Sequence, residues 1–201
     1  MGRYEPALDH SAQALRIFRT IGDRLGEANA LNQIGVVHMH LGHPGDAMAH
    51  SARALAIYRE IGDRSDQVNA LNNIGAVLAS TGCHEMARQY LRQSLQLAQQ
   101  QHQRSAEAEA YNGLGEAELA AGRPDEAVAA HLEALACAHA IGYGRQQARA
   151  HRGIAEALHA VGRPAQAREH WQHALQQYEN LGVPEARSMM TARRRVDTRG
   201  R

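Results

Sequence analysis

The sequence contains no lysine, because all 22 of its basic residues are arginines. This excludes a Schiff-base lysine and the phosphate-binding lysine of a P-loop. Aromatic residues make up only 4% of a chain that is 44% hydrophobic, so any core consists of aliphatic and small side chains, which suit closely packed helices. There is no apolar run of the roughly 18 residues that a membrane span needs, and no signal-peptide layout. We therefore expect a cytoplasmic protein.

Cysteines and catalytic motifs are equally sparse. Cys83 and Cys137 lie far apart without a CxxC pattern, which argues against a disulfide framework. The motifs GxSxG, HExxH and GxxxxGK[ST] do not occur. Paired acids such as Glu116 and Glu118 are typical of a solvated helix surface. No catalytic residue is predicted, and we do not expect an enzyme.

The 13 histidines are dispersed along the chain. His38 and His40 are two residues apart and would point to different sides of a helix, while His170 and His173 form an isolated pair at i,i+3 spacing. Neither pair has a cysteine or carboxylate at a convincing metal-ligand spacing. The sequence therefore predicts no metal site and no cofactor.

The net charge of +1 conceals an asymmetry. Residues 187–201 carry six arginines and one aspartate, or +5, which leaves 16 arginines against 20 acids, or −4, for residues 1–186. The basic tail has no interleaved aromatic residues, so it is more typical of a capping end than of a nucleic-acid contact.

An internal repeat of 40 residues organises the chain. NALNQIGVV begins at Asn29 and NALNNIGAV at Asn69, and EAYNGLGEA and RAHRGIAEA follow at Glu109 and Arg149. Within each copy, apolar residues recur at three- and four-residue steps, which predicts two amphipathic helices. Glycine and proline between them, as in LGHPGDA, are typical of one helix ending and the next beginning. Loops are expected near residues 22–25, 42–44, 62–65, 82–84, 102–105, 122–124, 142–145 and 162–164.

These repeats resemble the tetratricopeptide repeat (TPR) family, which has a small residue in the middle of the first helix and two on the second. Gly35, Gly75 and Gly115 match the first position, whereas the fourth repeat has Ala155 there. The 40-residue period approaches that of HEAT and armadillo repeats, but the rows of small residues favour TPR. The resemblance implies an all-α, right-handed superhelix, or α-solenoid, of antiparallel helix hairpins.

The whole chain is predicted to be one TPR domain. Its expected divisions are a half repeat at 2–26, four repeats at 27–66, 67–106, 107–146 and 147–186, and a capping helix with the basic tail at 187–201. Residues 2–26 would be a second helix without its partner, as in an excised piece of a longer protein. LGVPEA before a charged segment resembles the end of the TPR region in actinobacterial antibiotic-regulatory (SARP-type) transcription regulators.

The first helices of such hairpins line the concave face of the superhelix. Asn32, Asn72 and Asn112 recur there, and a side-chain amide can bind the backbone of an extended peptide or, alternatively, bridge neighbouring repeats. The resemblance to kinesin light chains, where matching asparagines lie in the cargo groove, implies binding. The other predicted contacts, which form a polar wall over an apolar floor, are Asn29, Gln33, Val36, Met39, Asn69 and Asn73.

The fourth repeat replaces the asparagine by Arg152, with Arg149 one turn earlier. The two guanidinium groups could bind a carboxylate of the partner or could pair with Glu109 and Glu116 of the preceding repeat. All four residues are included in the predicted partner-binding site.

Taken together, the sequence predicts a scaffold that binds a protein or peptide, as the regulatory module of a larger transcription regulator. Nucleic acid would be bound only by a separate domain of that parent protein. The alternatives are a sensor of a peptide or small ligand and a homo-oligomer formed through the unpaired N-terminal helix.

Overall fold

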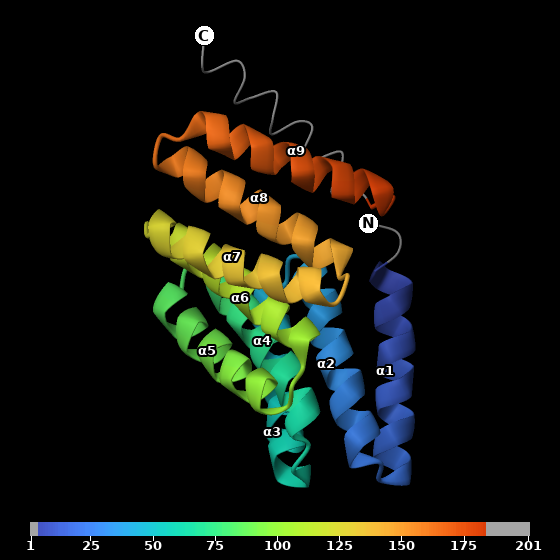
Figure 1. The fold of residues 1–201 in the computed structure, drawn as a ribbon. Coiled ribbons are helices and arrows are strands. Elements are labelled where there is room, and N and C mark those ends of the chain that lie inside the picture. The colour runs from blue at the N-terminus through green and yellow to red at the C-terminus, as the bar shows by residue number, and fades with distance from the viewer. Residues whose placement is uncertain (1–3, 184–201) are drawn as a thin grey trace. The chain divides into compact units, whose positions relative to one another are not determined.

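The computed structural model describes residues 4–183, which form nine α-helices and no β-strand (Figure 1). The predicted all-α solenoid of helix hairpins is confirmed, and the predicted loops match the observed breaks to within two residues. None of these helices is long and apolar enough to cross a membrane. The helices are α1 (Tyr4–Ile21), α2 (Arg24–His40), α3 (Pro44–Ile61), α4 (Arg64–Ser80), α5 (His84–Gln100), α6 (Arg104–Ala120), α7 (Pro124–Ala140), α8 (Gly144–Ala160) and α9 (Pro164–Asn180).

The chain divides into two compact units, Met1–Ala106 and Glu107–Arg201. The first unit contains α1 followed by the hairpins α2–α3 and α4–α5, and the second contains most of α6 with α7 and the hairpin α8–α9. The division lies between residues 106 and 107, and the predicted single TPR domain with its repeat divisions stays a prediction. The predicted capping helix and basic tail at 187–201 lie outside the described residues.

The helix ends follow from local backbone chemistry. Gly62 ends α3 in the left-handed conformation with a φ of 75°, and Asp63 then caps α4 by accepting a hydrogen bond from the Asp66 N–H at 3.0 Å. His102 occupies the corresponding place between α5 and α6 with a φ of 54°, although it has a side chain. The turn geometry is therefore kept where the sequence lacks the glycine.

Small residues allow the two helices of a hairpin to approach closely. A β-carbon added at Gly35 would lie 2.5 Å from the Ser51 hydroxyl oxygen, and one at Gly75 would lie 2.5 Å from Cγ of Leu91. The alanine rows on the second helices are buried completely. The members of these rows are Ala47, Ala87, Ala127 and Ala167, and Ala54, Ala134 and Ala174. The cores are built from such contacts, as the low aromatic content predicts.

Helix α1 packs against α2 but has no helix before it in the described residues. Ala7, Ser11 and Ala14 are accordingly half-buried, whereas the matching residues one repeat later are fully buried. Ile17 on the same helix is 59% exposed. Self-association through α1 stays a prediction.

Because α4 and α5 approach closely at Gly75, we expect a glycine-to-alanine change to alter the stability differently there than at Gly45. Gly75→Ala should destabilise the protein by about 1 to 3 kcal/mol, because the new β-carbon meets Leu91. Gly45→Ala is the matched control: Gly45 is also helical, but a β-carbon there meets no atom within 4 Å. The control should stabilise by up to about 1 kcal/mol through helix propensity. Urea unfolding checks both, and equal effects would contradict this packing.

Candidate functional site

The predicted polar wall lies along α2 and α4, which pack side by side in the first unit. Asn29, Gln33 and Asn69 are exposed there, and Asn32 and Asn73 are half-buried. The Asn73 side-chain NH₂ donates to the Asn32 side-chain oxygen at 2.9 Å. This amide pair bridges two successive repeats and leaves polar groups of both residues free for another partner.

A cavity of about 130 Å³ opens beside this amide pair, between α2, α3 and α4. Its lining includes three of the predicted site residues, Val36, Met39 and Asn73. The rest of the lining consists of Gly35, His40, Ser51, Ala76 and Val77. Of the predicted polar residues only Asn73 lines this cavity, next to Val36 and Met39, and Asn32 is joined to it through the amide pair.

Two buried polar groups of the first unit have no hydrogen-bond partner. The Ser51 hydroxyl lines the cavity and is fully buried, and the Asn72 side chain, on α4, is unpartnered at both its oxygen and its nitrogen. A buried polar group without a partner costs roughly 1 to 3 kcal/mol of stability. Ser51 therefore offers an unused hydroxyl at the cavity wall.

Asn112 occupies the position of Asn72 one repeat later but is fully satisfied. Its NH₂ donates to the main-chain oxygen of Gln146 at 3.1 Å and to the Gln146 side-chain oxygen at 2.9 Å. Nδ1 of His131 donates to its side-chain oxygen at 2.9 Å. Asn112 has no accessible surface, so the geometry here fits the alternative in which the amide bridges neighbouring repeats.

The predicted arginine pair in the second unit is bonded to an acid of the same unit. Arg149 contacts both Glu116 carboxylate oxygens, at 2.8 and 2.7 Å, and Arg152 reaches the same carboxylate at 3.1 Å. Burial alone would raise the pKa of Glu116, but Arg149 and Arg152 outweigh it and lower that pKa to about 2. Glu109 accepts a hydrogen bond from the Tyr143 hydroxyl at 3.3 Å. A carboxylate of a partner would have to displace Glu116 to bind both arginines.

His131 lies at the centre of this network and was not predicted as a site residue. Burial lowers the pKa of His131 to about 4, with Arg149 and Arg152 adding to the effect and Glu116 opposing it. Since Nδ1 donates to Asn112, Nε2 carries the lone pair, and it is buried without a partner. The imidazole is therefore neutral at pH 7.

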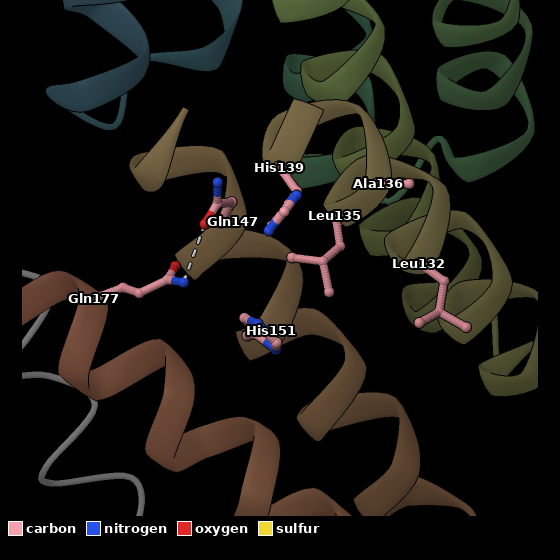
Figure 2. Close-up of a pocket in the computed structure, with 7 residues that line it drawn as sticks. All are labelled: Leu132, Leu135, Ala136, His139, Gln147, His151 and Gln177. Atoms are coloured by element: carbon pink, nitrogen blue, oxygen red, sulfur yellow. Dashed lines mark hydrogen bonds between the residues drawn. The ribbon is translucent and has the colours of Figure 1, made fainter. Parts of the chain in front are cut away.

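A second hollow of about 510 Å³ lies in the second unit, and Figure 2 shows its lining. Leu132, Leu135, Ala136 and His139 come from α7, Gln147 and His151 from α8, and Gln177 from α9. The Gln177 side-chain NH₂ donates to the Gln147 side-chain oxygen at 3.2 Å. The sequence did not predict this hollow, because the predicted contacts all lie on the first helix of each repeat. Leu132 on the second helix is 49% exposed, and the sequence alone does not show this exposure.

The tetratricopeptide repeat profile matches residues 1–60 and 66–139 of the sequence. The chain belongs to the tetratricopeptide repeat family. This assignment decides between TPR and the HEAT and armadillo repeats that the 40-residue period also suggested. No curated protein matches the sequence.

Solved structures share this TPR fold at low sequence identity. A Rap protein complexed with Competence and Sporulation Factor has a TM-score of 0.81 and 21% identity, over 89% of this chain and 50% of its own. The Rap conjugation gene regulator of plasmid pLS20, in complex with the Phr* peptide, has a TM-score of 0.80 and 16% identity, over 92% and 52%. A putative kinesin light chain variant of Podospora anserina has a TM-score of 0.67 and 14% identity, over 90% and 89%. This chain spans about half the length of the two Rap proteins.

The buried neutral imidazole of His131 makes the stability depend on pH. Below its unfolded pKa of 6.5, the unfolded chain binds a proton that the folded chain does not bind until pH is about 4. The free energy of unfolding should therefore fall as pH decreases from 6.5 to about 4, with a slope for this one group of about 1 kcal/mol per pH unit.

His131→Leu tests this assignment, because leucine already fills the matching position, Leu91, one repeat earlier. Urea unfolding measured across this pH range should show a smaller slope in the variant than in the wild type. His151, whose pKa burial also lowers to about 4, accounts for part of the slope that persists. An unchanged slope would show that His131 does not titrate as the structure implies.

Proposed function

We propose that this TPR chain is a protein-interaction module whose first unit binds an extended peptide segment of a partner protein along α2 and α4. The observation that carries the proposal is the apolar cavity of about 130 Å³ beside the Asn32–Asn73 amide pair. A site of this kind combines an apolar anchor with amides that recognise main chain, which suits a peptide better than a fully polar or fully apolar ligand.

The size of the cavity limits the anchor residue of the peptide. An engineered protein cavity of about 150 Å³ accepts benzene, so a space of this volume accommodates one aliphatic side chain or one phenyl ring. Val36 and Met39 would contact that side chain on α2, and the Ser51 hydroxyl could receive or donate one hydrogen bond at the wall. The expected ligand therefore has one medium-sized apolar residue at its centre.

The exposed amides would recognise the peptide backbone on either side of this anchor. Asn29, Gln33 and Asn69 are accessible. The Asn29 oxygen already accepts from the Tyr58 hydroxyl at 2.7 Å and the Asn69 NH₂ donates to Asp66 at 3.3 Å, so Asn29 would act mainly as a donor, Asn69 mainly as an acceptor and Gln33 as either. Each net hydrogen bond of this kind contributes about 1 kcal/mol. Several of them together with the apolar anchor support binding without strong sequence requirements at the flanking positions.

Two of the structural neighbours support the peptide proposal. One Rap protein was solved with Competence and Sporulation Factor, and the pLS20 regulator with the Phr* peptide. The resemblance to actinobacterial regulators supports a further step, in which this module controls a larger transcription regulator by holding or releasing its partner.

Peptides selected from a random-sequence display library on the whole chain provide the direct test. Binding of a selected peptide should weaken at least tenfold in Val36→Trp, because the indole fills the cavity, and a tenfold loss corresponds to about 1.4 kcal/mol. Asn73→Ala should weaken it by a smaller factor, because one bridging amide is lost. Fluorescence anisotropy of the labelled peptide measures each affinity, and circular dichroism confirms that each variant is folded.

Leu132→Asp is the control, because it places a charge in the other hollow, in the second unit. It should leave peptide affinity unchanged within about twofold. If Leu132→Asp abolishes binding while Val36→Trp does not, the first-unit site is wrong.

A small-molecule sensor is the competing function, and the hollow in the second unit favours it. Its volume of about 510 Å³ lies in the range of roughly 300 to 1,000 Å³ typical of small-molecule sites, and leucines meet polar His151 and Gln147 there. Peptides that depend on Leu132 rather than on Val36 would place the binding site in this hollow instead of in the first unit.

A further inference from the structure

The turn between α2 and α3 gathers histidines that are separated in the sequence. His38 lies in the last turn of α2, His43 immediately precedes α3, and Asp46 lies in the first turn of α3. One ligand atom from each of the three residues lies within 4.8 Å of the other two. The spacing of His38 and His40 in the sequence does not indicate this cluster, because the chain reverses direction between His38 on α2 and Asp46 on α3.

The His38 side chain points to a ligand independently of the clustering. Its Nδ1 is buried and has no hydrogen-bond partner, and it lies 3.9 Å from a carboxylate oxygen of Asp46. His43 and Asp46 are exposed, so their side chains can move without disturbing the core. A buried ring nitrogen without a hydrogen-bond partner thus faces two side chains that can adjust their positions.

His50 borders the cluster and holds part of its backbone in place. Its Nδ1 donates to the main-chain oxygen of Asp46 at 2.8 Å, and its ring stacks on that of His38 at 5.3 Å between centroids. This hydrogen bond leaves Nε2 of His50 with the lone pair. Contacts of this kind orient the residues around a metal site.

The cluster is specific to one repeat of the chain. The positions matching His38, His43 and Asp46 contain Leu78, Cys83 and Met86 in the next repeat and Leu158, Arg163 and Gln166 in the fourth. In the third repeat, Glu118 and Arg123 at the first two positions form an ion pair. That ion pair shows that side chains at these positions meet across the turn, and only the first repeat has a metal-binding residue type at all three of them.

We propose that His38, His43 and Asp46 bind a divalent transition-metal ion such as Zn²⁺, with water in the fourth position. Two imidazoles and a carboxylate are a donor set that zinc accepts, at about 2.0 to 2.2 Å per bond. Tetrahedral geometry at that bond length places the ligand atoms about 3.3 Å apart, which small rotations of His43 and Asp46 achieve. The ion links the end of α2 to the start of α3 and stabilises the folded hairpin.

Calorimetric titration of Zn²⁺ into the whole chain, purified without a polyhistidine tag, tests the site. We expect one tight site per chain, a higher melting temperature with Zn²⁺, and neither effect with Mg²⁺. His43→Ala and Asp46→Ala should each weaken Zn²⁺ binding at least tenfold and lose the rise in melting temperature. His38→Leu should do the same while keeping the core filled, since leucine occupies the matching position 78.

His173→Ala provides the matched control within the same chain. His173 belongs to another histidine group, in which the Nδ1 atoms of His151 and His170 lie 3.0 Å apart and the His173 ring lies 5.1 Å from that of His151. The control should bind Zn²⁺ like the wild type. Absence of Zn²⁺ binding in the wild type, unchanged binding in His43→Ala, or an equal loss in His173→Ala would each overturn the proposal.

Discussion

The contact between a small residue on the first helix of each hairpin and one side chain on the second helix is the constraint on which both units depend. At Gly35, Gly75 and Gly115, a β-carbon would lie 2.5 Å from an atom of the facing side chain, so the helices meet at a distance that only a small residue permits. The facing residue differs between repeats: Ser51, Leu91 and His131 take this position in turn. The backbone packing is thus constant, while the chemistry at its centre varies.

That variation determines the polar chemistry of each unit. In the second unit, His131 bonds Asn112 and its neighbours Arg149 and Glu116 form a charged network, so the polar groups are used internally. In the first unit, Leu91 and Ala106 stand at the positions of His131 and Gln146, and the Asn72 side chain has no hydrogen bond. Ser51 lines a cavity where the later repeats have larger side chains. In the proposed function, ligand binding therefore falls to the first unit, whereas the polar groups of the second unit are used to brace its helices.

The 40-residue period allowed nearly every helix to be predicted, because apolar spacing and glycine or proline breaks act locally. The pairing of Asn32 with Asn73 does not follow from that register, which matches Asn32 with Asn72. The sequence could not show which asparagine side chains already have hydrogen-bond partners. Asn112 is bonded to His131 and Gln146, which lie 19 and 34 positions further along the chain, and Asn72 has no such partners. The His38 cluster was missed for a related reason, because its members meet across a turn rather than along one helix.

Replacing Asn72 and Asn112, which occupy matching positions, by leucine tests most directly how the facing residue determines the role of the asparagine. The free energy of unfolding should fall by about 2 to 4 kcal/mol in Asn112→Leu, which strands the polar groups of His131 and Gln146 inside the unit. In Asn72→Leu it should stay unchanged or rise, because an unpartnered buried amide is replaced by an apolar group of similar size. Equal losses in the two variants, measured by urea unfolding, would contradict the claim that the residue facing each small position decides how the neighbouring asparagine is used.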